Sequence, residues 1–375
     1  MEKRGQETTT PMINLNKRYT SASQTDWQGR NEGDDLSVQR WFQRIEIVDL
    51  EKSDLPDLTN IKGLAILGFS CDTGVGRNQG RQGSVNGPTA IRKICSNLPV
   101  HFQAGFKLID AGSIGCPDDQ LERSQLQLGR AVAEILSKGY RLIIWGGGHE
   151  LMFGHYTGII NYLHQQPQFE KKLLADQNLP EKTNEEITIP LKKTIKNKLG
   201  IINFDAHFDL RKLGISGANS GTGFWQASEL ARANHDDFNY LALGIQKISN
   251  TRSLFDLAEL LEVDYVEAKY FSADNSLFVE TKIAGFIENI DKIYLTICLD
   301  VFSAAFAPGV SASAYTGIMP DAFFFRMYEM ILTSGKLIGM DIAELNPAFD
   351  QDNRTARLAA SLSFEFVQEM FDALN

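Results

Sequence analysis

The chain has 375 residues, a formal net charge of −10, and 43% hydrophobic, 22% charged and 10% aromatic residues. This composition is typical of a globular protein with a sizeable core and excludes disorder for most of the chain. An acidic chain lacks the basic surface that displaces counterions from phosphates, which argues against nucleic-acid binding and against binding to anionic membranes.

The first 35 residues are polar and rich in Thr, Ser, Asn and Gln. Such a composition predicts a loosely held N-terminal arm, residues 1–35, ahead of the folded part of the chain. The cluster Asp26-Trp27-Gln28-Gly29-Arg30 within this arm is too specific for a mere tail.

Beyond the arm, short apolar runs alternate with segments of helical period. The apolar runs predict strands at 64–69, 107–110, 142–145, 199–204, 240–243, 294–299 and 337–342. Helices are predicted between them, for example over 119–138 and 354–372, where apolar residues recur on one face. Strands that alternate with helices indicate an α/β fold with a mostly parallel, buried sheet that is covered on both faces.

Residues 165–197 interrupt this alternation. They combine many lysines with three prolines and only a weak apolar pattern. Because surface loops absorb insertions readily, we expect a solvated surface insertion here.

The four cysteines, Cys71, Cys95, Cys116 and Cys298, are scattered along the chain, and none forms a CxxC pair. So few cysteines cannot provide a disulfide framework for a chain of this length, which favours a reducing compartment. The N-terminus lacks an apolar signal segment and no run of about 18 apolar residues occurs, so neither export nor membrane insertion is expected. These features predict a protein of the cytoplasm.

Four polar motifs each follow directly after a predicted strand. In parallel α/β sheets ligands bind at the carboxyl ends of the strands, so the four motifs are predicted to converge on one crevice. The first is Gly146-Gly147-Gly148-His149-Glu150, whose glycines allow a tight turn close to a ligand and deliver His149 at the head of the next helix. Taken alone, a histidine there is more often a hydrogen-bonded structural group than a ligand.

The second motif runs from Asn203 to Asp209 and places Asp205, His207 and Asp209 at every second position. On an extended segment this spacing points all three side chains the same way. Three ionisable groups that face one point repel one another or lose solvation unless a cation lies between them. The motif therefore predicts metal binding.

The third and fourth motifs close two further strands. Asp300 ends an otherwise apolar strand and so faces a polar crevice, with Cys298 on the same strand face. By itself, Cys298 is more typical of a small core residue. Glu344, in the stretch 339–347, ends the last predicted strand and is expected to face the same crevice; a helix-capping role is the alternative.

In this order, the motifs resemble those of the arginase (ureohydrolase) superfamily, in which GG(G/D)H, DAHxD, SxDxD and a late D(I/V)xExNP recur. The resemblance extends from about Trp27 to Leu374 and implies a single three-layer α/β/α domain over residues 36–375, with a central, mostly parallel sheet. It also implies a site for two Mn²⁺ ions that share a hydroxide, with Asp205 as a bridging ligand. The residues that match the family's ligands are His149, Asp205, His207, Asp209 and Asp300, and Cys298 stands at the sixth ligand position.

Cys298 departs from the family pattern, because an aspartate that bridges the two ions is expected at its position. A thiolate is softer than a carboxylate, so it favours Zn²⁺ or Fe²⁺ over Mn²⁺ if it bridges. The alternative is a site that holds one ion firmly and a second one weakly.

Further stretches are similar to the formimidoylglutamase branch of the superfamily, namely 27–30, 68–75, 77–83, 220–222 and 307–311. Arginases and agmatinases carry histidine where Ser220 stands. The branch implies hydrolysis of N-formimidoyl-L-glutamate to L-glutamate and formamide, a step of histidine degradation. In this interpretation Asp209 accepts a proton and Glu344 pairs with the amidinium.

The two carboxylates of such a substrate need local cations in an acidic protein. Arg77, Arg81 and Arg211 are the candidates because a guanidinium binds a carboxylate in bidentate fashion, although a structural salt bridge is an equal alternative for each. Asn219, Ser220 and Thr222 are candidates for further hydrogen bonds to the substrate.

Three other functions remain open on the sequence. A related ureohydrolase that acts on agmatine or guanidinobutyrate shares the metal motifs, and Cys298 makes a non-catalytic binding paralogue conceivable. A deacylase of the histone-deacetylase type is disfavoured by the DAHFD and GGGHE stretches. The expected partners are a small-molecule substrate and further copies of the chain in a homo-oligomer, with neither nucleic acid nor membrane.

Overall fold

The computed structural model describes residues 13–372, apart from positions 16, 57, 59–61, 104 and 165–197. Its strands are β1 (Tyr19–Thr20), β2 (Ile45–Ile47), β3 (Gly63–Ser70), β4 (Lys107–Gly115), β5 (Arg141–Gly146), β6 (Leu199–Phe204), β7 (Asn239–Ile245), β8 (Asp264–Glu267), β9 (Lys292–Cys298) and β10 (Leu337–Ala343). Its helices are α1 (Trp41–Arg44), α2 (Thr73–Arg77), α3 (Gly87–Cys95), α4 (Leu121–Ser137), α5 (Leu151–His164), α7 (Gly223–Asn234), α8 (Arg252–Leu260), α9 (Ser276–Glu288), α10 (Ala322–Leu332) and α11 (Arg354–Asp372).

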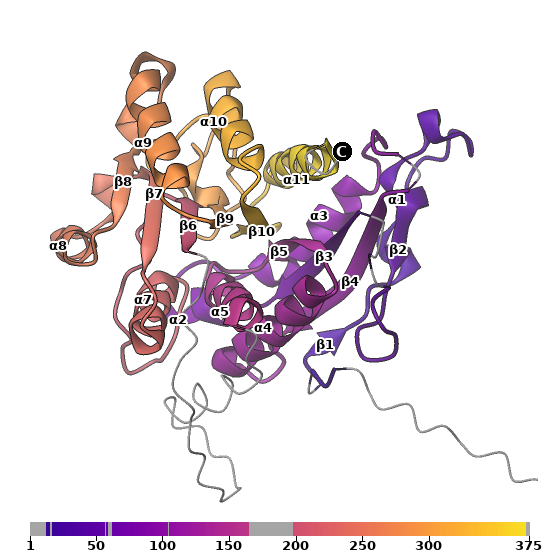
Figure 1. Ribbon diagram of the computed structural model, residues 1–375, viewed down its shortest axis with the longest axis horizontal. Helices are drawn as coiled ribbons and strands as arrows, with labels where there is room; N and C mark the ends of the chain where they lie inside the picture. Colours follow the sequence, from indigo (N-terminus) through magenta and orange to yellow (C-terminus); the bar gives the residue numbers. More distant parts are fainter. Residues whose placement is uncertain are drawn as a thin grey trace, which may run out of the picture.

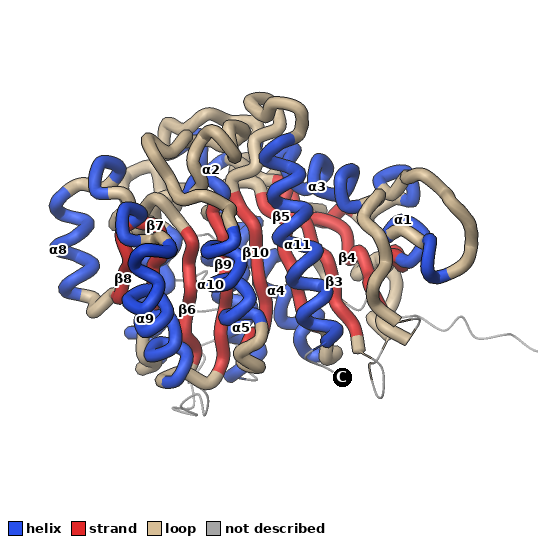
Figure 2. The backbone as a smooth tube through the Cα atoms, turned by 90° about the horizontal axis from the view of Figure 1, so that it is seen from above, coloured by secondary structure: helices blue, strands red, loops and turns tan. Residues whose placement is uncertain are grey.

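The strands form one ten-stranded sheet in the order β1-β4-β3-β5-β10-β9-β6-β7-β8, with β2 also paired to β4. Every pairing is parallel except that of β1 with β4. Strand β10, the last along the described chain, lies in the middle of the sheet between β5 and β9, as Figure 2 shows. The two halves of the sheet are therefore joined by β10, which comes late in the sequence.

Helices cover both faces of the sheet (Figure 1). Helices α3, α10 and α11 contribute to the hydrophobic core on one face, and α4, α5 and α7 to the core on the other. In β3, Leu64 and Ile66 belong to the first core, whereas Ala65 and Leu67 belong to the second. Because a parallel strand is buried on both faces, its sequence is a continuous apolar run. The predicted three-layer α/β/α fold is confirmed.

The seven predicted strands correspond to β3 to β7, β9 and β10, and the two predicted helices to α4 and α11. The strand predicted over 294–299 ends one residue earlier, because Leu299–Val301 form a short 3-10 helix that carries Asp300. Strands β1, β2 and β8 escaped prediction because they have only two to four residues and show no period.

Part of the N-terminal segment is held against the sheet. Strand β1 pairs with the end of β4, and Trp27 is buried with only 1% of its surface exposed. The Trp27 indole Nε1 donates a hydrogen bond to Asp110 at 2.8 Å, and Arg92 forms an ion pair with the same carboxylate at 2.7 Å. Since a buried charge is stabilised by such partners, Trp27 takes part in a buried polar cluster.

Two further expectations concern the periphery of the fold. The predicted insertion at 165–197 lies outside the described residues. Within the described ranges, none of the helices combines the length and the apolar character needed to cross a membrane.

Candidate metal centre

The four motifs lie at the carboxyl ends of four neighbouring strands, β5, β10, β9 and β6. After β5 the chain turns sharply, and the N–H of Gly148 donates to the carbonyl of Cys71 at 2.9 Å. A Cβ atom on Gly147 would collide with the Cys71 backbone, so this turn requires glycine. The turn places His149 beside the residues that follow β6 and β9, which confirms the predicted convergence of the motifs.

His149 belongs to a first group of potential metal ligands. Its Nδ1 lies 2.9 Å from Asp205 Oδ2 and 3.0 Å from Asp209 Oδ2. One donor atom each from His149, Asp205 and Cys298 lies within 4.8 Å of the others. These distances place an imidazole, two carboxylates and a thiol around one point.

His207 belongs to a second group. Its Nδ1 lies 3.2 Å from Asp300 Oδ2 and 3.5 Å from Asp205 Oδ1. The donor atoms of Asp205, His207 and Asp300 again lie within 4.8 Å of one another. Asp205 thus faces both groups and turns a different oxygen toward each histidine, an arrangement that suits a bridging ligand.

The charges of these side chains depend on one another. Burial lowers the pKa of His149 and of His207, but the adjacent carboxylates outweigh burial and raise both pKa values well above the usual one. Burial raises the pKa of Asp205, yet its contacts with the two histidines outweigh burial and lower the pKa. Burial and the neighbouring Asp205 raise the pKa of Asp209. The cluster of carboxylates therefore favours a positive charge between them. The raised pKa values of His149 and His207 reflect this preference.

This donor set fits divalent cations. Carboxylates and imidazoles suit Mn²⁺ and similar hard ions, while a thiol adds a softer donor. Cys298 is buried, and burial followed by the surrounding carboxylates raises the pKa of its thiol well above the usual value. Asp300 Oδ1 is buried and has no hydrogen-bond partner among the described residues. A bound cation would satisfy this oxygen and the negative charge around it.

Two residues at the centre have an unusual backbone conformation. Asp209 has φ = 48° and Glu344 has φ = 73°, in the left-handed region that residues other than glycine rarely adopt. Such backbone strain persists only where the surrounding structure enforces it, and it concentrates at functional sites. The Glu344 N–H donates to the carbonyl of Gly147 at 2.7 Å, which holds the end of β10 against the first motif.

The two carboxylate oxygens of Glu344 have different environments. Its Oε1 accepts a hydrogen bond from the His149 N–H at 2.7 Å, just before α5, whereas its Oε2 is buried without a partner among the described residues. Burial, with the charge of Asp300, raises the pKa of Glu344 to about 7, although the nearby Ser311 side chain acts to lower it. One oxygen thus supports the turn at the head of α5, in line with the alternative capping role, and the other is available to a cationic group.

The structure ties Arg77 and Arg81 to other parts of the protein. The Arg77 guanidinium pairs with Glu122 at 2.7 Å and donates to the carbonyls of Asp119 and Ala218. The Arg81 guanidinium donates to the carbonyls of Val310 and Ser311, 2.6 and 3.2 Å away, and stacks on the Phe349 ring at 4.0 Å. These contacts correspond to the structural alternative for both arginines.

Arg211 has a different environment. It is exposed, and its Nη1 donates to Asn78 Oδ1 at 2.7 Å. The side-chain amide of Asn78 in turn donates to Ser220 Oγ at 3.0 Å. The structure therefore brings Arg211 and Ser220 together through Asn78, a residue whose role the sequence did not reveal.

Asn219 and Thr222 bond mainly to each other. The Thr222 hydroxyl is fully buried, donates to the carbonyl of Asn219 at 2.9 Å and accepts from its N–H at 3.0 Å. Asn219 Oδ1 accepts the N–H of Gly221 at 2.9 Å. These bonds shape the loop before α7.

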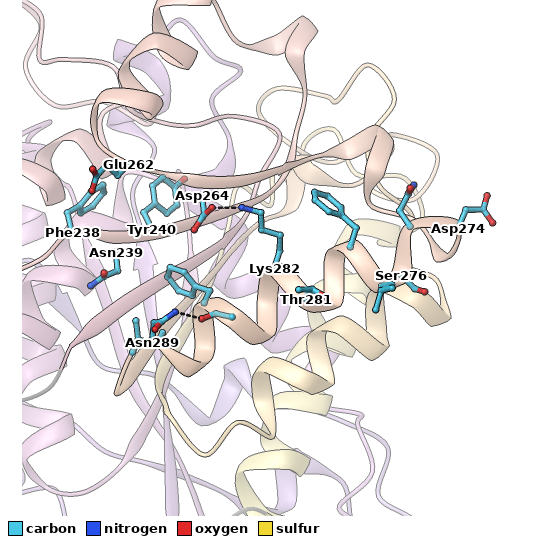
Figure 3. A pocket seen from close by; sticks show the side chains of 16 residues that line it. Phe238, Asn239, Tyr240, Glu262, Asp264, Asp274, Ser276, Thr281, Lys282 and Asn289 are labelled. Atoms are coloured by element: carbon cyan, nitrogen blue, oxygen red, sulfur yellow. Dashed lines mark hydrogen bonds and ion pairs between the residues drawn. The ribbon is translucent and has the colours of Figure 1, made fainter.

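A cavity of about 920 Å³ lies elsewhere, at the edge of the sheet between β7, β8 and α9 (Figure 3). An ion pair of 2.6 Å between Lys282 and Asp264 crosses its wall. None of its lining residues belongs to the metal centre. We assign the chemistry to the metal centre because ligand-type side chains converge there and not in this cavity.

The comparisons with known proteins agree with this geometry. A family profile described as "Arginase family" matches residues 62–172 and 184–368. The formimidoylglutamase of Clostridium tetani is 39% identical over 359 residues, which cover 95% of this chain and 97% of that protein. The formimidoylglutamase of Photobacterium profundum is 39% identical over 350 residues, 90% of this chain and 93% of that one.

Solved structures show the same fold at lower identity. The crystal structure of formimidoylglutamase from Bacillus subtilis aligns with a TM-score of 0.69 at 19% identity and covers 92% of this chain and 95% of its own. The crystal structure of Trypanosoma cruzi formiminoglutamase with Mn²⁺ aligns with a TM-score of 0.67 at 21% identity and covers 83% of this chain and 94% of its own.

Proposed function

Because the chain belongs to the arginase family, we propose that it is a metal-dependent formimidoylglutamase, which hydrolyses N-formimidoyl-L-glutamate to L-glutamate and formamide. Curated relatives named formimidoylglutamase, 36–39% identical over most of the chain, support this substrate. The observation that carries the proposal is the position of Asp205, which faces two groups of ligand-type side chains at once.

His149, Asp205, Asp209 and Cys298 would hold one divalent ion, and Asp205, His207 and Asp300 a second one. When bound, such ions lower the pKa of water, so that a nucleophile forms near neutral pH. We propose Mn²⁺ as the metal, because hard donors predominate and because the Trypanosoma cruzi formiminoglutamase structure is described with Mn²⁺. Cys298 is the single soft donor of the set, and Zn²⁺ or Fe²⁺ is the alternative that it supports.

Asp209 is proposed as the group that accepts a proton during hydrolysis. Its carboxylate lies beside Nδ1 of His149, at 3.0 Å, and the effect of burial on its pKa makes it a stronger base than an exposed aspartate. Asp209 makes this contact from an unusual, left-handed backbone conformation. A proton held there can be passed on to the leaving amine.

Glu344 is proposed to bind the amidinium group of the substrate. Its buried Oε2 has no partner in the described part of the chain, so an N–H donor that arrives with positive charge satisfies it. The amidinium also favours the ionised form of a carboxyl group whose pKa burial has raised. The substrate is thereby oriented with its carbon toward the metal ligands.

Arg211 is the proposed cation for a substrate carboxylate. It is exposed beside the centre, and Asn78 and Ser220 extend its polar surface. Arg77 and Arg81 are no longer proposed as carboxylate ligands, since their guanidinium groups already bind protein carbonyls and Glu122. For Asn219 and Thr222 we propose support of this loop.

A substrate panel combined with metal analysis tests the proposal. The protein reconstituted with Mn²⁺ should release formamide from N-formimidoyl-L-glutamate and should release no urea from agmatine or guanidinobutyrate. Urea release without formamide release would assign the chain to another branch of the family. Absence of turnover, with less than one ion bound per chain, would favour the non-catalytic paralogue. The cytoplasmic location and the homo-oligomeric state belong to this proposal as well.

A further inference from the structure

The imidazole of His149 is held from both sides. Its Nδ1 faces Asp205 and Asp209, and its Nε2 lies 2.9 Å from the hydroxyl of Thr296 on β9. Thr296 is fully buried, and its Oγ1 also lies 2.5 Å from Asp341 Oδ1 on β10. A buried chain of hydrogen bonds therefore leads from Asp341 through Thr296 to the potential metal ligand.

Asp341 is a fully buried carboxylate that is surrounded by donors. Its Oδ2 accepts the Tyr294 hydroxyl at 2.5 Å and lies 2.7 Å from Nδ1 of His155 on α5. Since a buried carboxylate is stable only with such partners, Asp341 acts as the acceptor at the end of the chain. Its position is fixed by residues from β9, β10 and α5.

Packing leaves His155 little freedom to move. Its ring lies 4.5 Å from the Tyr294 ring, measured between centroids, and is fully buried. A Cβ atom on Gly339 would come within 2.9 Å of His155 Nε2, so the close approach of this ring to β10 requires glycine. The partner of Asp341 is thus itself fixed by the fold.

The direction of the hydrogen bonds follows from the number of protons. A threonine hydroxyl has a single proton to donate, and it accepts further bonds through its oxygen. Because Asp341 can only accept, the Thr296 proton points to Asp341, and the Thr296 oxygen must accept from His149. Nε2 of His149 therefore keeps its proton, and Nδ1, which lies beside Asp205 and Asp209, is the ring nitrogen that can give up its proton and bind a cation.

We infer that Asp341, acting through Thr296, is a positioning residue that fixes the tautomer and the ring orientation of His149, so that Nδ1 is the atom presented to the metal. The inference rests on the metal centre of the proposed function. It extends the site to two residues, Asp341 and Thr296, that lie outside the two groups of ligand-type side chains. The loss of such a supporting hydrogen bond typically lowers metal affinity by about 10- to 100-fold.

A pair of substitutions at position 296 tests the inference. Thr296→Val keeps the shape of the side chain and removes the hydroxyl, whereas Thr296→Ser keeps the hydroxyl. In calorimetric Mn²⁺ titrations, we expect Thr296→Val to lower the affinity for the more tightly bound ion by about 10- to 100-fold. Thr296→Ser should keep this affinity within about threefold of wild type. Thr157→Val is the matched control, because the buried Thr157 hydroxyl donates to the Phe153 carbonyl of its own helix and forms no other hydrogen bond among the described residues.

A second measurement needs no variant. Long-range ¹H–¹⁵N spectra of histidine-labelled, Zn²⁺-loaded protein report which ring nitrogen of each histidine binds the ion, and His149 should show a bound Nδ1 and a protonated Nε2. A bound Nε2 would overturn the inference, as would equal Mn²⁺ affinity of wild type and Thr296→Val. If wild-type protein itself binds no divalent ion, the proposed function fails instead, so the two failures are distinguishable.

Discussion

Glu344 accepts a 2.7 Å hydrogen bond from the backbone N–H of His149, a residue 195 positions earlier in the chain. This bond joins the end of the central strand β10 to the head of α5 and leaves one Glu344 oxygen buried and unpaired among the described residues. The same carboxylate therefore supports the loop that carries His149 and keeps one oxygen for the proposed contact with the substrate.

Replacement of Glu344 by glutamine should separate its support of the His149 loop from its proposed contact with the substrate. The amide oxygen of Glu344→Gln can still accept the His149 N–H, so metal content should stay as in wild type. The charged contact to the amidinium is lost, which we expect to cost about 1.5–3 kcal/mol, or about 10- to 150-fold in kcat/KM. Steady-state kinetics with metal analysis on the same samples measures both effects. Loss of metal in this variant would contradict the assigned role.

Replacement of Asp205 by asparagine should remove metal and activity together, because Asp205 contacts both histidine groups. We expect the variant to retain less than one ion per chain after dialysis, and its turnover to fall to background. Asp264→Asn, which within the described part of the chain breaks the Lys282 ion pair at the sheet edge, is the matched control and should behave as wild type. Full metal occupancy in Asp205→Asn would refute the bridging role.

Replacement of Cys298 by aspartate should strengthen Mn²⁺ binding. The pKa of the buried Cys298 thiol is raised by burial and by nearby carboxylates, so metal binding through the sulfur must displace a proton. An aspartate is ionised without this step and is the harder ligand. Mn²⁺ titrations between pH 6 and 9 should therefore show a weaker pH dependence for Cys298→Asp than for wild type. Weaker Mn²⁺ binding or lower activity would instead identify the cysteine as the preferred ligand.

The stability of the metal-free protein should fall as the pH rises toward 8. Burial and the charge of Glu344 raise the pKa of Glu150 to about 8, and the pKa of Glu344 is raised to about 7. The folded state then binds more protons than the unfolded state above pH 4.5, so the stability present at low pH is lost as the pH passes through the raised pKa values.

Glu150→Gln removes the part of this dependence that comes from Glu150. In urea unfolding of the chelator-treated protein, it should gain on the order of a few kcal/mol over wild type at pH 8 and little at pH 5. An equal gain at both pH values would show that the effect does not come from the ionisation of Glu150.

Cys116 should be the most reactive of the four cysteines. A hydrogen bond from Cys71, followed by contacts with Ser124 and Thr73, lowers the pKa of the Cys116 thiol, and this residue is not fully buried. Thiolates are the reactive form, so iodoacetamide at pH 7 should label Cys116 before the buried Cys95. Peptide mass spectrometry over a time course measures the order, and Cys116→Ser should abolish the early phase.

The sequence predicted the strands that are long enough to show a pattern. The run Leu64–Leu67 alternates between two cores, which produces a continuous apolar stretch. Motifs at strand ends located the candidate metal centre, since the topology of parallel sheets dictates where such ends meet. Tyr19–Thr20 is too short to have a period, and its strand exists only because β4 offers it an edge.

The contact partners of individual side chains could not be predicted from the sequence. Arg81 has the right chemistry for a carboxylate, but only the folded chain shows that the carbonyls of Val310 and Ser311 already bind it. Thr296 and Asp341 lie 45 positions apart and meet only because β9 pairs with β10. No local pattern predicts such pairing, although Asp341 lies within the stretch 339–347 and Thr296 stands two residues before Cys298.

The central position of β10 sets the moment at which the metal centre can form. The sheet contacts of β1 to β5 on one side and of β6 to β9 on the other are joined only by this strand within the described chain. During synthesis, His149 and Asp205 leave the ribosome long before β10, which must then insert between β5 and β9 and bring Glu344 and Asp341 with it. A nascent chain that stops short of β10 holds most of the candidate ligands but lacks the strand that aligns them, so metal loading should begin only after β10 has emerged from the ribosome.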